Sequence, residues 1–427
     1  MLSVKNPIMT GFFPDPSICR VGNKFYTVHS TFAYFPGVPV FESEDLVHWN
    51  LISNVLDRDS QVPLSGCQHS QGIFAPTIRY HKGTWYMITT NVSDQGNFIV
   101  TAKDPRGPWS EPYYLGESTG GIDPSLFFDD DGTCYYIGQR PRSAGYRYNG
   151  DCEIWIQTLD LDTMQLKPDA TIVLTGFQRK AIWPEGPHLY KKDGYYYILH
   201  AESGTSIHHS VMIARSKNVF GPYEYCPCNP ILTHRHLGAQ YPVTCVGHAD
   251  LVDDGNGNWY MVVLACRPNQ GYTLLGRETF LAKVTWEDGW PVVNAGVGHL
   301  EEVVTLPYEG QPSDDVPQCK TFDTPSLPLE LLTLRNHRDH ELELHAEEHI
   351  VRLFHRCDSL KDCGEPAYLA LRQQHWNCEF ETSFIPHFCK ESDCAGIAMV
   401  QSNENHLRAE CYPQDSGVKL VVSLCKD

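Results

Sequence analysis

Residues 184–200, PEGPHLYKKDGYYYILH, have the pattern of a β-hairpin. An alternating apolar run leads into the turn at 191–194, and a run of aromatic and β-branched residues returns from it. The start of this hairpin is unusual, because the carboxylate of Glu185 stands between Pro184 and Gly186 where the first strand begins.

The same hairpin pattern occurs five times along the chain. We call the first residue of each copy its head residue. Successive head residues are 60, 48, 62 and 63 residues apart, and a repeat of this length indicates a solenoid, a propeller or an array. Because each unit consists of strand and turn patterns with no helical pattern between units, the sequence predicts a β-propeller with small sheets around a channel. The copies are DPSICRVGNKFYTVHS from Asp15, APTIRYHKGTWYMITT from Ala75, DPSLFFDDDGTCYYIG from Asp123, EGPHLYKKDGYYYILH from Glu185 and HADLVDDGNGNWYMVVL from His248.

The five head residues are expected to surround the propeller axis at one mouth. Equivalent positions in successive blades lie at the same radius and height if the hairpins form the inner strands. A single Asp-Pro pair is explained by turn preference alone. Acids at the same repeat position in three of five units instead favour a shared pocket that contains Asp15, Asp123 and Glu185.

Two carboxylates that face one pocket are the minimum set for glycoside hydrolysis. One donates a proton to the leaving oxygen, and the other activates water or attacks the sugar. Our hypothesis assigns Glu185 as the general acid and Asp15 as the general base. Asp123 would raise the pKa of Glu185, because a neighbouring like charge disfavours ionisation.

Other residues near the heads are candidates for contact with a substrate. The aromatic residues Phe32, Phe35, Phe74 and Trp183 either form a platform for a sugar or pack the blades. Arg277 lies on an otherwise apolar strand where a charge needs a partner, so it pairs with a pocket acid or binds a sugar hydroxyl. His248 is either a buried histidine bonded to backbone or a contact for substrate, for water, or for a metal ion through water.

The repeats end near residue 306, which divides the chain into three parts. We expect a catalytic propeller at 1–306, a linker rich in Pro, Ser and Asp at 307–328, and a C-terminal domain at 329–427. Alternating strand patterns at 341–345, 378–384 and 418–422 predict a β-sandwich for this last part. The predicted fold class is therefore all-β, a five-bladed propeller followed by a short and incomplete sandwich.

Composition narrows the range of partners. There are 33 Lys and Arg residues against 52 Asp and Glu residues, so the formal net charge is −19, which makes nucleic acid and anionic membranes poor partners. No apolar run approaches the roughly 20 residues of a membrane span. The first residues lack a secretion signal and the 16 cysteines have the character of reduced thiols, so we expect a cytoplasmic protein.

Six ordered motifs resemble glycoside hydrolase family 43, in particular its β-xylosidase and α-L-arabinofuranosidase branch. The likeness runs from residue 6 to about residue 306, and LRQQH at 371–375 resembles the C-terminal sandwich of the same branch. The motifs are NPI at 6–8 through FPDPS at 13–17, STF at 30–32 with FPGV at 35–38, GIFAP at 72–76, GIDPS at 121–125, PEGP at 184–187 and LGRET at 275–279.

This resemblance implies an exo-acting, inverting hydrolase that releases terminal α-L-arabinofuranosyl or β-D-xylosyl residues from hemicellulose-derived oligosaccharides. It implies base, modulator and acid at Asp15, Asp123 and Glu185, with sugar contacts from Arg277 and Phe32. Inversion requires the base and acid carboxyls to lie roughly 6.5–9.5 Å apart. The resemblance implies no required cofactor, a calcium ion or a water cluster near His248 in the channel, and leaves a homo-oligomer open.

Two departures from the family pattern matter, and two alternative functions stay open. Phe74 stands where many relatives carry Trp, and the C-terminal domain is about half the length found in relatives, where one of its loops closes the pocket. The first alternative is a retaining glycosidase or transferase acting on fructosyl sugars, for which the carboxyls would lie roughly 5–5.5 Å apart. The second is a non-catalytic sugar-binding propeller.

Overall fold

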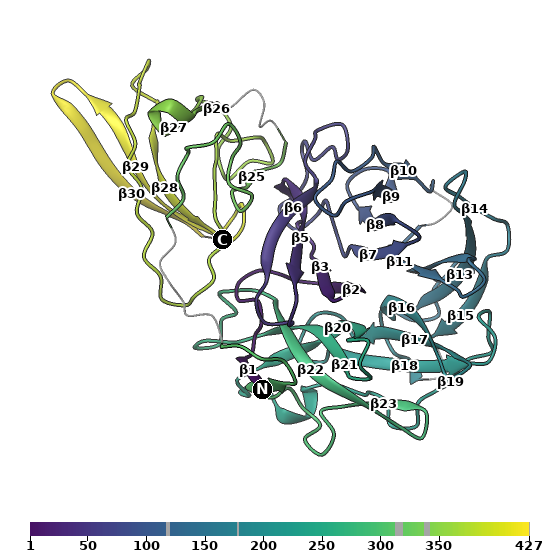
Figure 1. Ribbon diagram of the computed structural model, residues 1–427. Helices are drawn as coiled ribbons and strands as arrows, with labels where there is room; N and C mark the ends of the chain where they lie inside the picture. Colours follow the sequence, from purple (N-terminus) through teal and green to yellow (C-terminus); the bar gives the residue numbers. More distant parts are fainter. Residues whose placement is uncertain (117–119, 177–178, 312–318, 337–341, 427) are drawn as a thin grey trace.

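The computed structural model describes residues 1–116, 120–176, 179–311, 319–336 and 342–426 of the chain. Figure 1 shows five sheets arranged around a central axis, with a smaller all-β domain beside them. The described residues form strands joined by turns, and the short 3₁₀ turns among them include η2 (Arg235–Leu237) and η3 (Ala346–Glu348). None of the described helices has the length and apolar character needed to cross a bilayer.

Each predicted hairpin forms the two inner strands of a propeller blade. The strand order runs outward from the axis in every sheet, and β15 of the third blade pairs with β13. The first blade consists of β2 (Ser17–Val21), β3 (Lys24–Val28), β5 (Gly37–Ser43) and β6 (Asn50–Leu56), and the second of β7 (Thr77–His81), β8 (Thr84–Asn91), β9 (Gly96–Ala102) and β10 (Tyr113–Tyr114). The third consists of β11 (Ile122–Phe128), β12 (Cys134–Pro141), β13 (Cys152–Asp160), β14 (Gln165–Leu166) and β15 (Thr171–Thr175). The fourth consists of β16 (Glu185–Lys192), β17 (Tyr195–Glu202), β18 (Ser210–Ser216) and β19 (Glu224–Tyr225), and the fifth of β20 (Thr244–Asp253), β21 (Trp259–Cys266), β22 (Glu278–Glu287) and β23 (Trp290–Val293).

The hydrophobic core is divided into layers between neighbouring blades. One cluster packs Tyr86 of the second blade against Trp155 of the third, and another packs Ile137 of the third blade against Leu189 of the fourth. Similar clusters join the fourth to the fifth blade and the first to the second. The aromatic and β-branched return strands therefore stabilise the ring by removing apolar surface from water between sheets.

The ring is closed where the fifth blade meets the first. Strand β1 (Leu2–Lys5) pairs antiparallel with β24 (Val303–Leu306), and Val4 and Val304 pack in the cluster between these blades. Asn6 then bonds to the backbone of Leu281 in both directions, at 2.8 and 2.9 Å. The two ends of the propeller segment thus hold each other in place.

The five innermost strands, β2, β7, β11, β16 and β20, contact their neighbours around the axis. Three of the head residues, which lie on or just before these strands, have a left-handed backbone: φ is +53° at Asp15, +54° at Asp123 and +49° at His248. In the fourth blade the residue with this conformation is Gly186, with φ +59°, and not Glu185. The predicted repeat register was therefore wrong by one residue in this blade, and Glu185 precedes the repeat-equivalent position.

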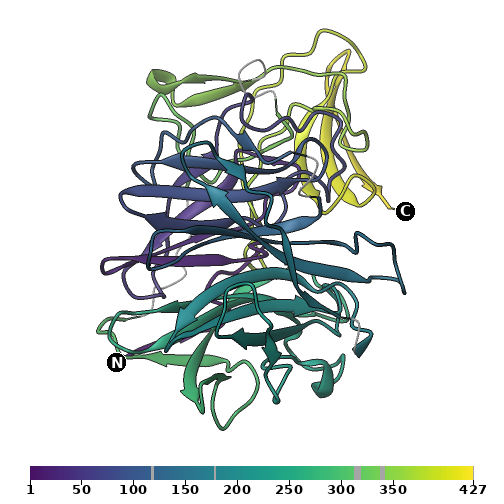
Figure 2. The same ribbon diagram turned by 90° about the vertical axis from the view of Figure 1, so that its right-hand side faces the viewer.

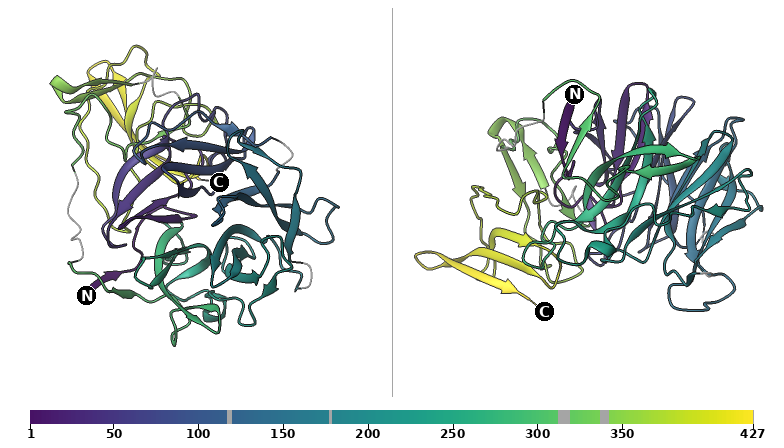
Figure 3. Two further views of the ribbon diagram at one scale, coloured as in Figure 1. Left: turned by 45° about the vertical axis from the view of Figure 1, so that its right-hand side comes forward. Right: turned by 90° about the horizontal axis from the view of Figure 1, so that it is seen from below.

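The C-terminal domain is attached to the first blade by a short sheet. Strand β25 (Thr333–Leu334) pairs with β4 (Tyr34–Phe35), and the Arg335 amide donates to the Ala33 carbonyl at 2.6 Å. The remaining strands are β26 (Leu342–His345), β27 (Ile350–Leu353), β28 (Ala395–Val400), β29 (His406–Gln414) and β30 (Gly417–Cys425). Figures 2 and 3 show this domain against one side of the propeller, with β28, β29 and β30 as a twisted three-stranded sheet.

The all-β propeller and sandwich class is confirmed, but one predicted strand of the C-terminal domain is wrong. Residues 378–384 form no strand, and Phe380 and Phe384 are exposed. Alternation gives a segment two distinct faces but does not supply a neighbouring backbone to bond with, and no described strand pairs with this segment. The predicted strands at 341–345 and 418–422 correspond to β26 and β30, while residue 341 and residues 312–318 of the predicted linker lie outside the described residues.

Candidate active site

All seven residues predicted for the site line one cavity at the mouth of the propeller. These residues are Asp15, Phe32, Phe74, Asp123, Glu185, His248 and Arg277. They come from the starts of inner strands in the first, third, fourth and fifth blades and from loops beside them. Side chains from segments up to 262 residues apart are in direct contact here, as the pair of Asp15 and Arg277 demonstrates.

Asp15 is buried and is held by two charge-stabilising partners. Arg277 donates to Oδ1 at 2.7 Å, and the Ser30 hydroxyl donates to Oδ2 at 2.6 Å. Burial alone would raise the pKa of this carboxyl, but Arg277, His248 and Ser30 outweigh it and hold the pKa below 3.8. Asp15 is therefore ionised at neutral pH, as a general base must be.

Glu185 has the opposite electrostatic environment. Burial is the main cause that raises its pKa well above 4.5, and the negative charges of Asp123 and Asp15 raise it further. Arg277 opposes this shift only in part. The environment of Glu185 therefore favours its protonated form, which is the form that a general acid requires.

Asp123 connects these two environments. Its Oδ2 accepts a hydrogen bond of 3.0 Å from the backbone amide of Gly186, the residue that follows Glu185. Burial raises the pKa of Asp123 to about 6, with the charge of Asp15 adding to the increase and His248 opposing it. Asp123 thus fixes the backbone that carries Glu185 and places a carboxyl beside it.

His248 packs against the glycine of this same turn. A side chain at Gly186 would place its Cβ 2.9 Å from the His248 ring, so both the positive φ and the close approach require glycine there. The charge of a protonated His248 would lower the pKa of both Asp15 and Asp123. The structure therefore places His248 among the carboxylates, where it can contact substrate or water.

Aromatic side chains form one wall of the cavity. The Phe32 ring stacks on Phe12 at 5.6 Å and meets the edge of Phe74 at 5.5 Å, and the Arg277 guanidinium lies 5.4 Å from the centre of Phe32. Phe12 was not predicted as a site residue, although it adjoins the FPDPS motif in the sequence. Phe35, in contrast, is buried in the core between the first and second blades.

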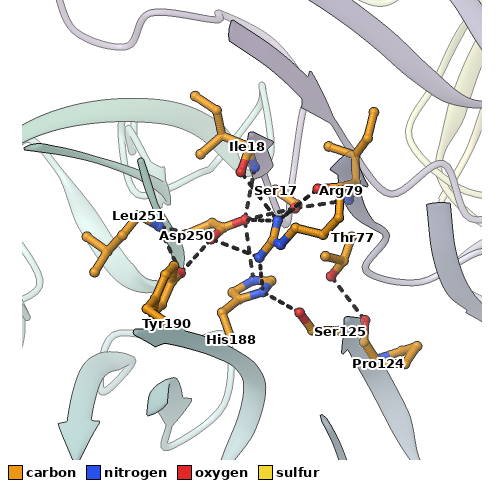
Figure 4. Close-up of polar contacts among 11 residues, drawn as sticks. Ser17, Ile18, Thr77, Arg79, Pro124, Ser125, His188, Tyr190, Asp250 and Leu251 are labelled. Atoms are coloured by element: carbon orange, nitrogen blue, oxygen red, sulfur yellow. Dashed lines mark hydrogen bonds and ion pairs between the residues drawn. The ribbon is translucent and has the colours of Figure 1, made fainter. Parts of the chain in front are cut away.

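The channel below the heads contains a buried ion pair that the sequence analysis missed. Figure 4 shows the Arg79 guanidinium in contact with Asp250, Ser17 and His188. Arg79 Nη1 donates to Asp250 Oδ2 at 2.9 Å, and Nη2 lies 3.1 Å from His188 Nδ1. The sequence does contain a signal for polar side chains in the channel, because the residue two positions after each head is polar in all five repeats when the fourth is counted from Gly186. These residues are Ser17, Thr77, Ser125, His188 and Asp250.

The calcium ion or water cluster near His248 that the resemblance implied stays a prediction. Calcium is bound by roughly six to eight oxygen ligands. Asp250 in the channel already accepts hydrogen bonds from Arg79, Ser17 and Tyr190. Burial would raise its pKa, but Arg79 and Tyr190 outweigh burial and hold the pKa far below 3.8. The described residues contain no group of three or more His, Cys, Asp or Glu side chains placed to hold a metal ion, around His248 or elsewhere.

A segment of the C-terminal domain reaches the mouth of the cavity. The Gln374 side chain donates to the Thr10 carbonyl at 3.4 Å, and Arg372 lies over the ring of Phe13 at 5.0 Å. Trp376 lies 5.1 Å from the guanidinium of Arg267, which pairs with the buried Glu278. Residues 371–376 therefore form part of the rim.

Comparison with known proteins agrees with this arrangement. Residues 4–291 match the family model for glycosyl hydrolases family 43, and residues 319–427 match the β-xylosidase C-terminal concanavalin A-like domain. A xylosidase/arabinosidase of Butyrivibrio fibrisolvens is 55% identical over 95% of this chain and 79% of its own length. A non-reducing end α-L-arabinofuranosidase of Bacteroides ovatus is 40% identical over 94% of this chain and 74% of its own length.

The same relationship holds for solved structures. The crystal structure of a xylan β-1,4-xylosidase from Bacillus halodurans superposes with a TM-score of 0.88 at 35% identity, covering 99% of this chain and 82% of the other. A family 43 enzyme from a Bacteroides ovatus xyloglucan locus gives 0.87 at 38% identity over 99% of this chain and 82% of the other. The chain belongs to glycosyl hydrolases family 43.

Proposed function

We propose that this glycoside hydrolase removes terminal pentosyl residues, α-L-arabinofuranosyl or β-D-xylosyl, from the non-reducing ends of oligosaccharides, with inversion. The relatives with the highest identities given above carry the names xylosidase/arabinosidase and arabinofuranosidase, which supports a pentose as the sugar removed. The retaining reaction on fructosyl sugars and the pure binding role have no comparable support.

One observation carries the proposal: two carboxyls of the same cavity, on Asp15 and Glu185, have pKa values shifted in opposite directions. Arg277 and Ser30 lower the pKa of Asp15, and burial together with the charge of Asp123 raises the pKa of Glu185. Two titratable groups whose environments separate their pKa values are the usual arrangement of an acid and a base. A binding protein gains nothing from keeping one carboxyl neutral and the other charged.

The proposed reaction is a single displacement. Asp15 accepts a proton from a water molecule while the water oxygen attacks the anomeric carbon, and Glu185 donates its proton to the glycosidic oxygen as that bond breaks. Both carboxyls then return to their starting states by exchange with solvent. The reaction needs no cofactor, and in the channel the Arg79 guanidinium supplies the positive charge beside Asp250.

The experiment that tests this function compares the wild type with Glu185→Gln on three substrates. These are an aryl α-L-arabinofuranoside, an aryl β-D-xyloside and an unactivated oligosaccharide of the preferred pentose. Loss of general acid catalysis should lower the oligosaccharide rate by roughly 10²–10⁴-fold and the aryl rate much less, because an aryl leaving group needs little protonation. Equal rates of oligosaccharide hydrolysis by variant and wild type, or no hydrolysis by the folded wild type, would contradict the proposal.

The compartment in which the protein acts and the association of its copies remain predictions. A reducing compartment such as the cytoplasm suits a chain whose 16 cysteines are all free thiols.

Association of copies is supported by exposed apolar side chains on β30, where Leu420, Val422 and Leu424 are each about two-thirds exposed. Size-exclusion chromatography with light scattering will give the mass in solution.

A further inference from the structure

Glu278 is a fully buried carboxylate that follows Arg277 in the chain, and the reaction proposed above does not use it. Its two oxygens accept hydrogen bonds from Arg267 at 2.7 and 2.8 Å, and Oε1 also accepts one from the Gly11 amide at 3.0 Å. A buried charge is stable only when it is paired and hydrogen-bonded, and these donors meet that need. We infer that Glu278 is a positioning residue that couples the C-terminal segment 371–376 to the catalytic cavity.

Gly11 lies between Glu278 and the C-terminal segment. A Cβ at Gly11 would lie 2.7 Å from the carbonyl oxygen of Gln373, and φ there is +91°, so both the space and the backbone conformation require glycine. The Gln374 side chain donates to the neighbouring carbonyl of Thr10 at 3.4 Å. The C-terminal segment therefore packs directly on the stretch of backbone that Glu278 holds through the Gly11 amide.

Arg267 forms the second link between Glu278 and the C-terminal segment. Its side chain is 22% exposed and lines the catalytic cavity. The ring of Trp376 lies 5.1 Å from the guanidinium, within the range of a cation–π contact. On its other side the guanidinium bonds to both oxygens of Glu278, and such a two-point bond fixes the orientation of both groups. The contact of Trp376 therefore reaches Glu278 through a single side chain.

One consequence concerns the aromatic wall of the cavity. Phe12 follows Gly11 directly, so the bond from the Gly11 amide to Glu278 fixes the backbone from which Phe12 extends. The Phe12 ring stacks on Phe32 at 5.6 Å and packs closely on Gly276, where a Cβ would lie 2.5 Å from the ring. A shift of Gly11 would therefore move the wall that we expect to contact the sugar.

The other consequence concerns the catalytic base, and this part of the inference rests on the proposed function. The Arg277 guanidinium donates to Asp15 Oδ1 at 2.7 Å, and the Arg277 carbonyl accepts from the Phe13 amide at 3.1 Å. The backbone that leads to Asp15 is therefore bonded to the backbone of Arg277 both through Phe13 and through the bond from Gly11 to Glu278. Misplacement of such groups by about 1 Å can lower a rate roughly 10²-fold.

The test is a double-mutant cycle between Trp376→Ala and Glu278→Gln in the full chain, with kcat/KM measured on an aryl pentoside. Trp376→Ala alone should lower kcat/KM roughly two- to fivefold, the value of a cation–π contact at a partly exposed site. In the double variant, Trp376→Ala should cause no further loss, because its link to the cavity is already broken. Trp376 also lines the cavity, and a direct contact with the sugar would give the same loss in both backgrounds. That result, or no loss in the single variant, would overturn the inference.

A second variant guards against loss of folding. Glu278→Asp keeps the buried charge beside Arg267, but it is one methylene too short to bond both Arg267 and Gly11. Trp376→Ala should again cause no further loss of kcat/KM in this background, and a full loss there would contradict the inference.

Glu153→Gln is the matched control for the cycle. Glu153 is a buried carboxylate of the third blade that accepts from Arg140 at 2.9 Å, and it does not line the catalytic cavity. The change should lower the thermal midpoint as Glu278→Gln does, yet Trp376→Ala should keep its full effect in this background. If that effect disappears here as well, the cycle reports general destabilisation and the coupling through Glu278 is refuted.

A binding measurement separates failure of this inference from failure of the proposed function. Calorimetry with D-xylose and with L-arabinose compares the dissociation constants of the wild type, both single variants and the double variant. Trp376→Ala should weaken binding of the preferred pentose roughly two- to fivefold in the wild type and not in Glu278→Gln. Absence of this difference would overturn the positioning role whatever the rate of hydrolysis. Its presence in a chain that hydrolyses no pentoside would overturn only the proposed function.

Discussion

The Asp123 carboxylate accepts a hydrogen bond of 3.0 Å from the backbone amide of Gly186, the residue next to Glu185. This bond joins the third blade to the fourth and holds the turn that presents Glu185 to the cavity. The same carboxyl adds negative charge beside Glu185, so Asp123 acts on both the position and the pKa of that residue.

Asp123→Asn should move the alkaline limb of the pH profile of kcat/KM toward lower pH. The amide oxygen can still accept from Gly186, but the negative charge that raises the pKa of Glu185 is gone, so Glu185 loses its proton at lower pH. The profile of kcat/KM reports the pKa values of the free enzyme. An alkaline limb that stays in place would contradict the electrostatic role of Asp123.

Ser30→Ala should move the acid limb of the same profile toward higher pH. The hydroxyl stabilises the ionised form of Asp15, so its removal raises the pKa of the base and leaves it protonated over a wider range. Near neutral pH, where Arg277 still holds Asp15 ionised, the rate should fall by less than about tenfold. Thr90→Ser, a buried hydroxyl of the second blade that bonds to Asn97, is a control that should move neither limb.

Arg79→Met should destabilise the propeller without touching the catalytic cavity. The substitution leaves Asp250, which is fully buried, without its cation. Breaking a buried ion pair by removing one partner costs roughly 3–5 kcal/mol, which thermal unfolding will detect as a lower midpoint. The double variant Arg79→Met with Asp250→Asn should recover part of that loss, and an unchanged midpoint in the single variant would refute the structural role of the pair.

Removal of divalent metal ions should leave the activity unchanged. Arg79 supplies the positive charge beside the carboxylate of Asp250, and the described residues contain no group of three or more His, Cys, Asp or Glu side chains placed to hold a metal ion. The measurement is the rate of pentoside hydrolysis after exhaustive treatment with a chelator and again after calcium is added. A loss of rate that calcium restores would show that a metal ion takes part.

The sequence was sufficient for the propeller and for the group of residues at its mouth. Both follow from one hairpin repeated five times, because equivalent positions in successive repeats lie at the same radius and height in the propeller. The register in the fourth blade was wrong because Glu185 was aligned as the acid of the repeat, whereas the backbone conformation aligns Gly186 with Asp15 and Asp123.

Features that depend on distant side chains could not be predicted from the repeat. Arg79 and Asp250 are 171 residues apart in the sequence. The periodicity of a strand does not indicate that a long side chain on it extends into the channel.

The configuration of the first sugar released tests the central claim most directly. Proton NMR recorded during early hydrolysis of a β-D-xyloside or an α-L-arabinofuranoside distinguishes the two anomers before mutarotation mixes them. Water activated by Asp15 with Glu185 as the acid predicts that the inverted anomer appears first, α-xylose or β-arabinofuranose. Initial appearance of the retained anomer would mean that a carboxylate attacks the sugar, and it would contradict the assignment of Asp15 as a general base.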